Sequence, residues 1–300
     1  MPRLTVLLPA LNAEDTIRVA VSSTLRGMPA DSELYVLDDG STDATAERAR
    51  EAGTRRGVVD KRLKVVSRPP SGGLAKALNS MLADTDSALV GRMDADDISL
   101  PWRFRVSLPA LDSGTDVVFT QVMRMSGRRI VPGPPVPIGP RDFPYHLLLT
   151  NPVTHPSMIA HREALSVVGE YRGVPAEDYD LWLRMAVQGV RMRRLPWACL
   201  ICRAHPRQIT STAGWHRRSW SDPLQAEAFA DLSEQLTGRR LRRIVSIALT
   251  DPGETREAEL REFEETMTRA ISTLPLPSRL VLHRRLRKRL EWARDHEPTT

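Results

Sequence analysis

Apolar and polar positions follow two different spacings over the first hundred residues. Leu4–Pro9 is a continuous apolar run without strict alternation, which is typical of a strand buried on both faces. Glu14–Leu25 carries apolar residues at helical spacing, and Asn12 is its expected N-cap. The pattern predicts further strands at Glu33–Leu37, Leu63–Ser67 and Ala88–Met93, and helices at Ala44–Ala52 and Leu74–Ala83. Strands that alternate with helices imply a parallel sheet covered on both faces.

The pattern loosens after this region. It predicts strands at Asp116–Met123, Ser157–Ala160 and Arg194–Arg203, a helix at Glu177–Gln188, and a surface loop at the proline-rich Val131–Pro140. From Arg218 onward the spacing is wholly helical. We therefore predict an α/β domain over residues 1–215 and a helical C-terminal appendix over residues 216–300.

The composition is that of an ordinary soluble globular protein, with 41% hydrophobic and 27% charged residues. No apolar run approaches the ~18 to 20 residues that a membrane span requires. A strand begins almost at the N-terminus, which leaves no room for a signal peptide, so we expect a cytoplasmic protein. The net charge is +6, but only four of the 43 basic residues are lysines. That skew is typical of genomic codon bias, so it does not indicate nucleic-acid binding.

The two cysteines form a single C-x-x-C, Cys199 and Cys202. One such pair is a weak zinc signal. Because it lies in a mostly apolar segment, we interpret the cysteines as small hydrophobic residues.

Acidic residues gather where two predicted strands end. They are Asp38 and Asp39 after the second strand, and Asp94, Asp96 and Asp97 after the fourth, with Arg92 two positions before Asp94. Ligands of open α/β sheets bind at the carboxyl ends of the strands. A D-x-D turn there can direct two carboxylates at one divalent metal and its diphosphate ligand, and Mg²⁺ and Mn²⁺ favour such oxygen ligands. One Asp-rich turn alone would also fit a solvated helix cap.

Other phosphate-binding signatures are absent from the sequence. It has no G-x-G-x-x-G after the first strand, no G-x-x-x-x-G-K-[ST] and no G-x-S-x-G. A nucleotide sugar fits what remains, because its diphosphate needs a metal and its base needs a polar pocket.

An ordered set of segments resembles glycosyltransferase family 2, of the GT-A fold. The segments are LLPALNAEDTI, VLDDGSTDAT, GGLAKALN, GRMDADDISLPWRF, NPVTHPSM, AEDYDLWLRM and RAHPRQIT. Their order and spacing agree over about residues 3–212. The resemblance implies a mostly parallel nucleotide-binding sheet flanked by helices, with the helical appendix outside the shared core.

The resemblance also implies roles for individual residues. Donor binding would involve Pro9, Asn12, Asp38, Asp39, Gly40, Ser41, Lys76, Asn79, Arg92 and Asp94. Asp96 and His205 would ligate Mn²⁺ or Mg²⁺. Asp178 would be the catalytic base, since a weakly nucleophilic hydroxyl must lose its proton. Residues that would support these groups or line the acceptor site are Asp97, His155, Glu177 and Trp182; for Trp182 core packing is the alternative, and for His155 a structural hydrogen bond.

The resulting prediction is a metal-dependent, inverting transferase of hexosyl or N-acetylhexosaminyl groups that uses a nucleotide sugar, with a UDP-sugar as the expected donor. Polysaccharide or lipid-linked glycan assembly is the expected role, and glycosylation of a peptide or small natural product is an alternative. A sugar-nucleotide nucleotidyltransferase would need a glycine-rich loop after the first strand, which LLPALNAED lacks. A degenerate, non-catalytic sugar or nucleotide-binding module would be expected to lose its carboxylates, which this sequence retains.

The helical appendix has two interpretations. Its apolar stripes predict packing against the catalytic domain or a second subunit in a homodimer. Its last helix, Arg279–Leu290, combines six basic residues with Leu282, Leu286 and Leu290 on one face. This pattern also fits peripheral contact with the inner face of an anionic membrane, into which those leucines would insert.

Overall fold

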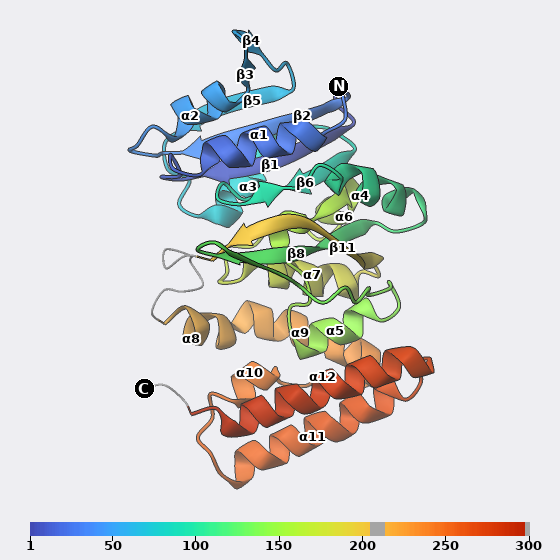
Figure 1. The fold of residues 1–300 in the computed structure, drawn as a ribbon. Helices are drawn as coiled ribbons and strands as arrows, with labels where there is room; N and C mark the ends of the chain where they lie inside the picture. The colour runs from blue at the N-terminus through green and yellow to red at the C-terminus, as the bar shows by residue number, and fades with distance from the viewer. Residues whose placement is uncertain (205–213, 298–300) are drawn as a thin grey trace. The chain divides into compact units, whose positions relative to one another are not determined.

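Figure 1 shows the chain as a computed structural model, which describes residues 1–204 and 214–297 apart from the side chain of Arg55. Contacts group the chain into two compact units. The first unit comprises Met1–Gly139, Val153–Gly173 and Val190–Pro206, and the second comprises Pro140–Pro152, Val174–Gly189 and Arg207–Thr300.

A twisted α/β sheet forms the centre of the first unit, in the order β5-β2-β1-β6-β10-β8-β11-β7 with β9 beside β8. The bounds of these strands are β1 Leu4–Ala10, β2 Ser32–Asp39, β5 Leu63–Arg68, β6 Leu89–Arg92, β7 Ile98–Ser99, β8 Val117–Ser126, β9 Arg129–Pro132, β10 Ile159–His161 and β11 Met192–Arg203. β5, β2, β1 and β6 are parallel to one another. Because β10 is antiparallel to both β6 and β8, β8 and its parallel neighbour β11 again run in the direction of β1.

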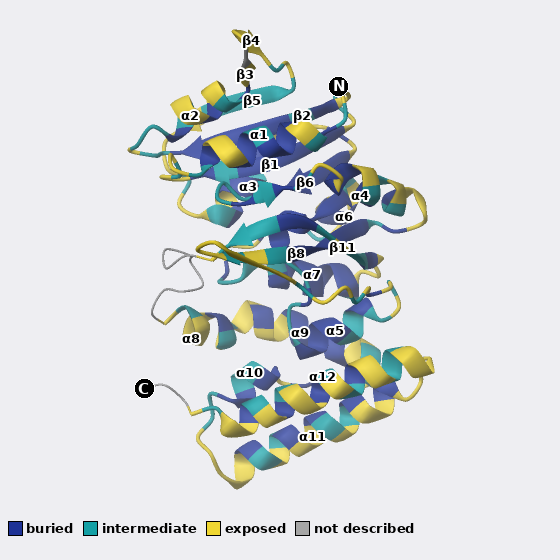
Figure 2. Ribbon diagram, in the orientation of Figure 1, coloured by how far each residue is buried: buried dark blue, intermediate teal, exposed yellow. Residues whose placement is uncertain are grey.

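Helices cover both faces of the parallel half. The helices of the first unit are α1 Ile17–Gly27, α2 Thr45–Ala52, α3 Leu74–Ala83, α4 Arg103–Asp112 and α6 Arg162–Ser166, with a 3₁₀ turn η1 at His155–Ser157 and a small hairpin of β3 Thr54–Arg55 and β4 Val58–Val59. α1 and α2 pack together on one face, and Leu4, Val6 and Leu8 of β1 are buried in the core below α1. The chain reverses direction across the sheet between β5 and β6, so right-handed crossover puts α3 on the other face. The central strands β1 and β2 are accordingly buried at all but one position each (Figure 2).

The second unit is helical. Its helices are α5 Phe143–Leu149, α7 Glu177–Val187, α8 Trp215–Trp220, α9 Pro223–Thr237, α10 Ile244–Ile247, α11 Glu254–Ile271 and α12 Leu276–Asp295. α5 and α7, which precede residue 215, pack against α9, and α12 packs against α5, α10 and α11. The two compact units therefore differ from the predicted domains, which are residues 1–215 and 216–300. Whether those two ranges are separate domains stays a prediction.

Most predicted elements are confirmed to within a few residues, and α3 has the predicted bounds. The N-cap prediction for Asn12 is wrong, because α1 begins at Ile17 with Thr16 at its N-cap position. The proline-rich loop is also more ordered than predicted. Arg129–Pro132 pairs with β8, and Ile138 is buried and bridges to Arg194.

The apolar face predicted for a membrane surface is instead part of the core of the second unit. Leu282, Leu286 and Leu290 are at most 3% exposed. They therefore stabilise the helical packing and are not available for insertion into lipid. Within the described residues, no helix is both long and apolar enough to span a membrane. Dimerisation through these helices stays a prediction.

Candidate functional site

Four loops meet at one edge of the parallel half of the sheet. Each follows the carboxyl end of a strand, after Ala10 of β1, Asp39 of β2, Arg68 of β5 and Arg92 of β6. The register places Ala10 opposite Asp38, and Asp39 opposite Arg68, so the ends of β1, β2 and β5 are nearly level, whereas Arg92 at the end of β6 lies opposite Leu7. The predicted donor-binding residues Pro9, Asp38, Gly40 and Arg92 thus come from neighbouring positions along this edge.

Asn12 joins the first loop to the second. Its backbone is in the left-handed region, at φ 50°, which asparagine tolerates better than most residues. Its N–H donates to Ser41 Oγ at 2.9 Å, and its Oδ1 accepts the N–H of Thr42 at 2.9 Å. Ser41 N–H in turn donates to Asp38 Oδ1 at 3.1 Å. Asn12 therefore positions the backbone of the second loop and caps no helix.

Asp39 joins the second loop to the third. This carboxylate is 9% exposed and accepts both the N–H and the hydroxyl of Ser71, each at 2.8 Å. Gly40 lies next to it at φ +83°, and a Cβ there would meet Pro70 Cγ at 2.5 Å. Only glycine therefore lets the two loops approach this closely.

The third loop leads into α3, which carries the two predicted residues Lys76 and Asn79. Lys76 is exposed in the first turn, behind the positive-φ pair Gly72 and Gly73. The Asn79 amide spans the backbone of Tyr171: its Nδ2 donates to the carbonyl oxygen at 2.9 Å, and its Oδ1 accepts the N–H at 3.1 Å. Lys76 thus has a side chain that can reach a ligand, whereas Asn79 fixes a loop.

The fourth loop contains the acidic turn after β6. Arg92 is 2% exposed, and its Nη2 lies 2.6 Å from Asp94 Oδ1. Asp94 and Asp96 are both partly exposed, whereas Asp97 is buried. The turn therefore presents its first two carboxylates outward and its third inward.

Asp97 joins this turn to the end of β11. Its Oδ1 accepts the N–H of Arg203 at 3.1 Å, and its carboxylate is also hydrogen-bonded to the Cys202 thiol. Burial and the neighbouring Asp94 carboxylate raise the pKa of Asp97 to about 7. Burial likewise raises the pKa of the Cys202 thiol, which keeps it protonated and able to donate. His205, the predicted second metal ligand, follows Arg203 by two positions and lies outside the described residues.

Arg103 holds the acidic turn from behind, a role that the sequence did not suggest. The side chain is completely buried, and its Nη2 donates to the carbonyl oxygens of Arg92 at 2.6 Å and Pro156 at 2.8 Å. Burial lowers its pKa to about 10. Arg103 thereby connects the end of β6 to η1.

The interpretation of the cysteines as small hydrophobic residues fits Cys199, whereas the Cys202 thiol is hydrogen-bonded to Asp97. Cys199 is buried, Cys202 is partly buried, and neither forms a disulfide. Nowhere in residues 1–204 and 214–297 do three or more His, Cys, Asp or Glu side chains converge as a complete metal site. Proteins nevertheless often bind Mg²⁺ through only one or two carboxylates, while substrate phosphates and water supply the other ligands. Asp94 and Asp96 could form such a partial set for Mg²⁺ or Mn²⁺. The acidic turn therefore fits a divalent cation that a diphosphate helps to bind.

Asp178 belongs to the second unit, in the first turn of α7. Its Oδ1 accepts a hydrogen bond from the N–H of Tyr179 at 2.7 Å, and its Oδ2 accepts one from Asn151 Nδ2 at 2.8 Å. The carboxylate is partly exposed, as is that of Glu177. Asn151 thus fixes the orientation of Asp178. The sequence offered the segment NPVTHPSM, which begins with Asn151, but no pattern linked that amide to Asp178.

Two residues considered for the acceptor site have structural surroundings. His155 is 8% exposed, and its Nε2 lies 2.8 Å from the hydroxyl of Tyr171. Trp182 is completely buried in α7. The alternatives of a structural hydrogen bond for His155 and of core packing for Trp182 agree with these positions.

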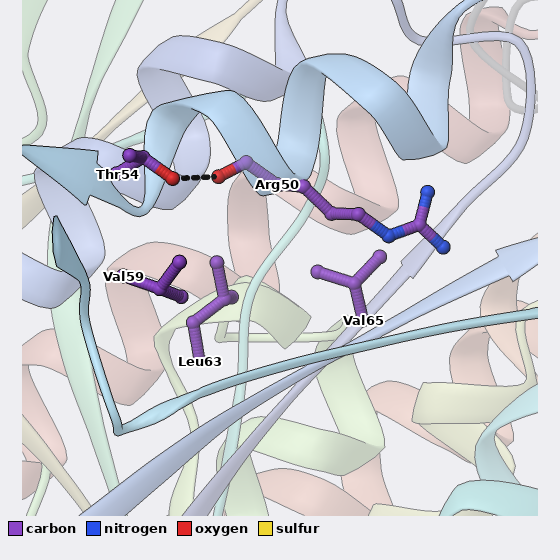
Figure 3. A pocket seen from close by; sticks show the side chains of 5 residues that line it. All are labelled: Arg50, Thr54, Val59, Leu63 and Val65. Carbon is purple, nitrogen blue, oxygen red and sulfur yellow. Dashed lines mark hydrogen bonds between the residues drawn. The ribbon is translucent and has the colours of Figure 1, made fainter. Parts of the chain in front are cut away.

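A cavity of about 250 Å³ lies away from the acidic loops. Its lining residues, shown in Figure 3, are Arg50, Thr54, Val59, Leu63 and Val65. Leu63 begins β5, so the cavity is at the opposite, amino-terminal edge of the sheet. It also lacks carboxylates, and we do not assign it to the functional site.

A comparison with protein families identifies the chain. The family model described as "Glycosyl transferase family 2" matches residues 5–164, which is more than half of the sequence. The chain belongs to glycosyltransferase family 2. The matched residues include all four loops at the carboxyl edge and the acidic turn, but they end before Asp178.

Similar proteins agree with this family. The chain is 26% identical over 182 residues to the Escherichia coli protein "UDP-Glc:alpha-D-GlcNAc-diphosphoundecaprenol beta-1,3-glucosyltransferase WfgD", which covers 60% of this chain and 68% of WfgD. Among solved structures, S. aureus TarS 1-349 in complex with UDP-GlcNAc has a TM-score of 0.61 at 19% identity, over 98% of this chain and 90% of TarS. The mannosyltransferase PcManGT from Pyrobaculum calidifontis, in complex with GDP-Man and Mn²⁺, has a TM-score of 0.53 at 19% identity, over 97% of this chain and 87% of PcManGT. The fold of this family 2 enzyme is GT-A.

The close approach at Gly40 gives a test of the loop connections. Gly40→Ala should lower the free energy of unfolding by about 2 kcal/mol or more, because the left-handed backbone costs about 1 kcal/mol and the Cβ overlaps Pro70. Gly57→Ala is the matched control, since Gly57 has a similar φ of +78° and open space around it. Urea unfolding of both variants measures the difference. Equal losses for the two would contradict the close packing of the second and third loops.

Proposed function

We propose that this family 2 glycosyltransferase moves a hexosyl or N-acetylhexosaminyl group from a UDP-sugar to an acceptor hydroxyl, with inversion at the anomeric carbon. The observation that carries the proposal is the acidic turn. It presents Asp94 and Asp96 outward at the edge where the three other loops are cross-connected. The printed names of WfgD and of the TarS complex, which contain UDP-Glc and UDP-GlcNAc, support the choice of donor.

The first three loops would bind the nucleotide. A carboxylate at Asp38 or Asp39 can accept an N–H of the base, and Pro9 and Ser41 flank that position at the ends of β1 and β2. Since Asn12 and Gly40 hold the backbone of the second loop, the base would meet a loop that is already positioned. Lys76, exposed behind two glycines, supplies a positive charge for the diphosphate.

The acidic turn would hold the cation. Asp96 is the proposed ligand, with Asp94 beside it and His205 as a further ligand. The Arg92 guanidinium restrains Asp94 at 2.6 Å, so that carboxylate is oriented before any ligand arrives. A bound Mg²⁺ or Mn²⁺ supplies charge neutralisation of the leaving diphosphate. The Mn²⁺ in the PcManGT complex supports this choice of metal.

Asp178 is the proposed general base. The acceptor oxygen forms a bond to the anomeric carbon while the bond from that carbon to the diphosphate oxygen breaks, and the hydroxyl proton passes to the Asp178 carboxylate. Asn151 donates to one oxygen of that carboxylate and thereby orients it. Attack from the side opposite the leaving group accounts for inversion.

The acceptor is proposed to be a growing polysaccharide or a lipid-linked glycan. Its support is the name of WfgD, which specifies a diphosphoundecaprenol-linked acceptor. We place the reaction in the cytoplasm. An enzyme that acts there on such an acceptor would need no membrane-spanning helix.

The metal assignment is tested by Asp96→Ala. We expect transfer to be abolished, and UDP affinity to lose its dependence on Mn²⁺, because the remaining carboxylates do not replace the missing ligand. Isothermal calorimetry of UDP with Mn²⁺ and with EDTA measures the effect. Asp112→Ala removes an exposed carboxylate at the end of α4 and should change neither quantity. Full activity of the wild type in EDTA would overturn the assignment.

The base assignment is tested by Asp178→Asn, which keeps the shape but removes proton acceptance. We expect kcat to fall by ~10² to 10⁴ with the donor Kd nearly unchanged. Asn151→Ala should lower kcat less, and it should have no further effect in the Asp178→Asn background, because it acts only through Asp178. Single-turnover assays and donor titrations separate rate from binding. A donor affinity that collapses together with the rate would identify Asp178 as a binding residue instead.

A further inference from the structure

The outward face of α12 carries exposed apolar side chains in its first turns. Leu276 is 58% exposed, Leu280 is 63% exposed and Val281 is 36% exposed. These residues directly follow the reversal between the packed helices α11 and α12. This face differs from the one that contains Leu282, Leu286 and Leu290, which is buried.

Basic residues follow the apolar ones on the same outward face. Arg284, Arg287 and Lys288 are exposed, and no acidic residue occurs between Leu276 and Glu291. Among the described residues, Arg284 and Lys288 form no ion pair, and Arg287 approaches Glu291 only at 3.8 Å. These exposed residues form what we call the α12 tip: Leu276, Leu280, Val281, Arg284, Arg287 and Lys288.

Several exposed arginines elsewhere in the second unit pair with carboxylates. Arg240 pairs with three carboxylates, Arg242 with Glu259, and Arg294 with Glu257 and Glu264. The α12 tip differs from these paired arginines, because it combines positive charge that lacks a close ion pair in the described part of the chain with exposed apolar surface.

We propose that the α12 tip docks on an anionic lipid surface. At about 1.5 Å per residue, Leu280 precedes Arg284 by roughly 6 Å along the helix. Apolar side chains would enter the boundary between headgroups and acyl chains, while the basic ones stay at the level of the lipid phosphates. Three apolar side chains at a helix reversal are too few for a stable protein interface, which buries about 800 Å² on each partner. A lipid surface accepts such a narrow tip.

The test is co-sedimentation of the full chain with vesicles of phosphatidylcholine that contain increasing fractions of phosphatidylglycerol. Binding should rise with the phosphatidylglycerol content and fall with added salt, which shortens the Debye length from about 10 Å at 0.1 M. Vesicle binding needs no donor or transfer, so its outcome is separable from that of the proposed function. A chain that does not sediment with phosphatidylglycerol vesicles at low salt would overturn the proposal.

Two variants locate the binding surface. Arg284→Glu with Lys288→Glu should weaken binding by more than tenfold, since each basic residue near the surface contributes about fivefold. Leu276→Ser with Leu280→Ser should weaken the binding that persists at high salt. The matched controls, Arg218→Glu with Arg261→Glu and Val58→Ser with Val59→Ser, change equally exposed residues elsewhere and should bind as the wild type does.

The same variants distinguish lipid from a second copy of the chain. All of them change exposed side chains, so their melting temperatures should match that of the wild type. If the leucine variant instead dissociates an oligomer on size-exclusion chromatography, or if the controls lose as much vesicle binding as the α12 tip variants, the proposal is wrong.

Discussion

The site depends on one electrostatic constraint, which is that several carboxylates share one edge of a parallel sheet. Neighbouring carboxylates repel one another, and proteins tolerate them where hydrogen-bond donors or cations compensate for the negative charge. Three of the carboxylates accept hydrogen bonds here: Asp38 from Ser41 of its own loop, Asp39 from Ser71 of the third loop, and Asp97 from Arg203 at the end of β11. The hydrogen bonds of Asp39 and Asp97 thereby connect segments that are far apart in the sequence. Asp94 and Asp96 are partly exposed, and under the proposed function their negative charge would attract a divalent cation.

The mixed half of the sheet completes this arrangement. β10 reverses direction, so β8 and β11 end at the same edge as β1 and β6. The end of β11 can then meet Asp97, and Arg103 can reach the carbonyl oxygen of Arg92 and that of Pro156. The buried Arg103 guanidinium donates to backbone carbonyl oxygens of two segments. It therefore fixes the start of the acidic turn more firmly than contacts within the turn alone would. The strand order therefore determines where the proposed metal ligands stand.

The sequence predicted what depends on local spacing. The strands and helices of the parallel half, and the acidic clusters at their ends, follow from short-range periodicity and from the rule that ligands bind at carboxyl edges. The functions of Asn12, Asn79 and Arg103 did not follow, because each bonds to a segment at least ten residues away. Asn12 shows the difference well: an asparagine before a helix is commonly a cap, but here Thr42 supplies a better donor across the loop. For a related reason the sequence left both packing and membrane contact open for the α12 leucines, since periodicity finds an apolar face without showing what covers it.

The central claim is that the acidic turn and a diphosphate bind one cation together. Titration of Mn²⁺ into the full chain, with free Mn²⁺ followed by electron paramagnetic resonance, tests this directly in the presence and absence of UDP. The account predicts weak binding to the protein alone and one Mn²⁺ per chain bound at least about tenfold more tightly with UDP, because the diphosphate supplies ligands that the carboxylates leave open. Equal Mn²⁺ affinity with and without UDP, or no Mn²⁺ uptake in either case, would contradict it.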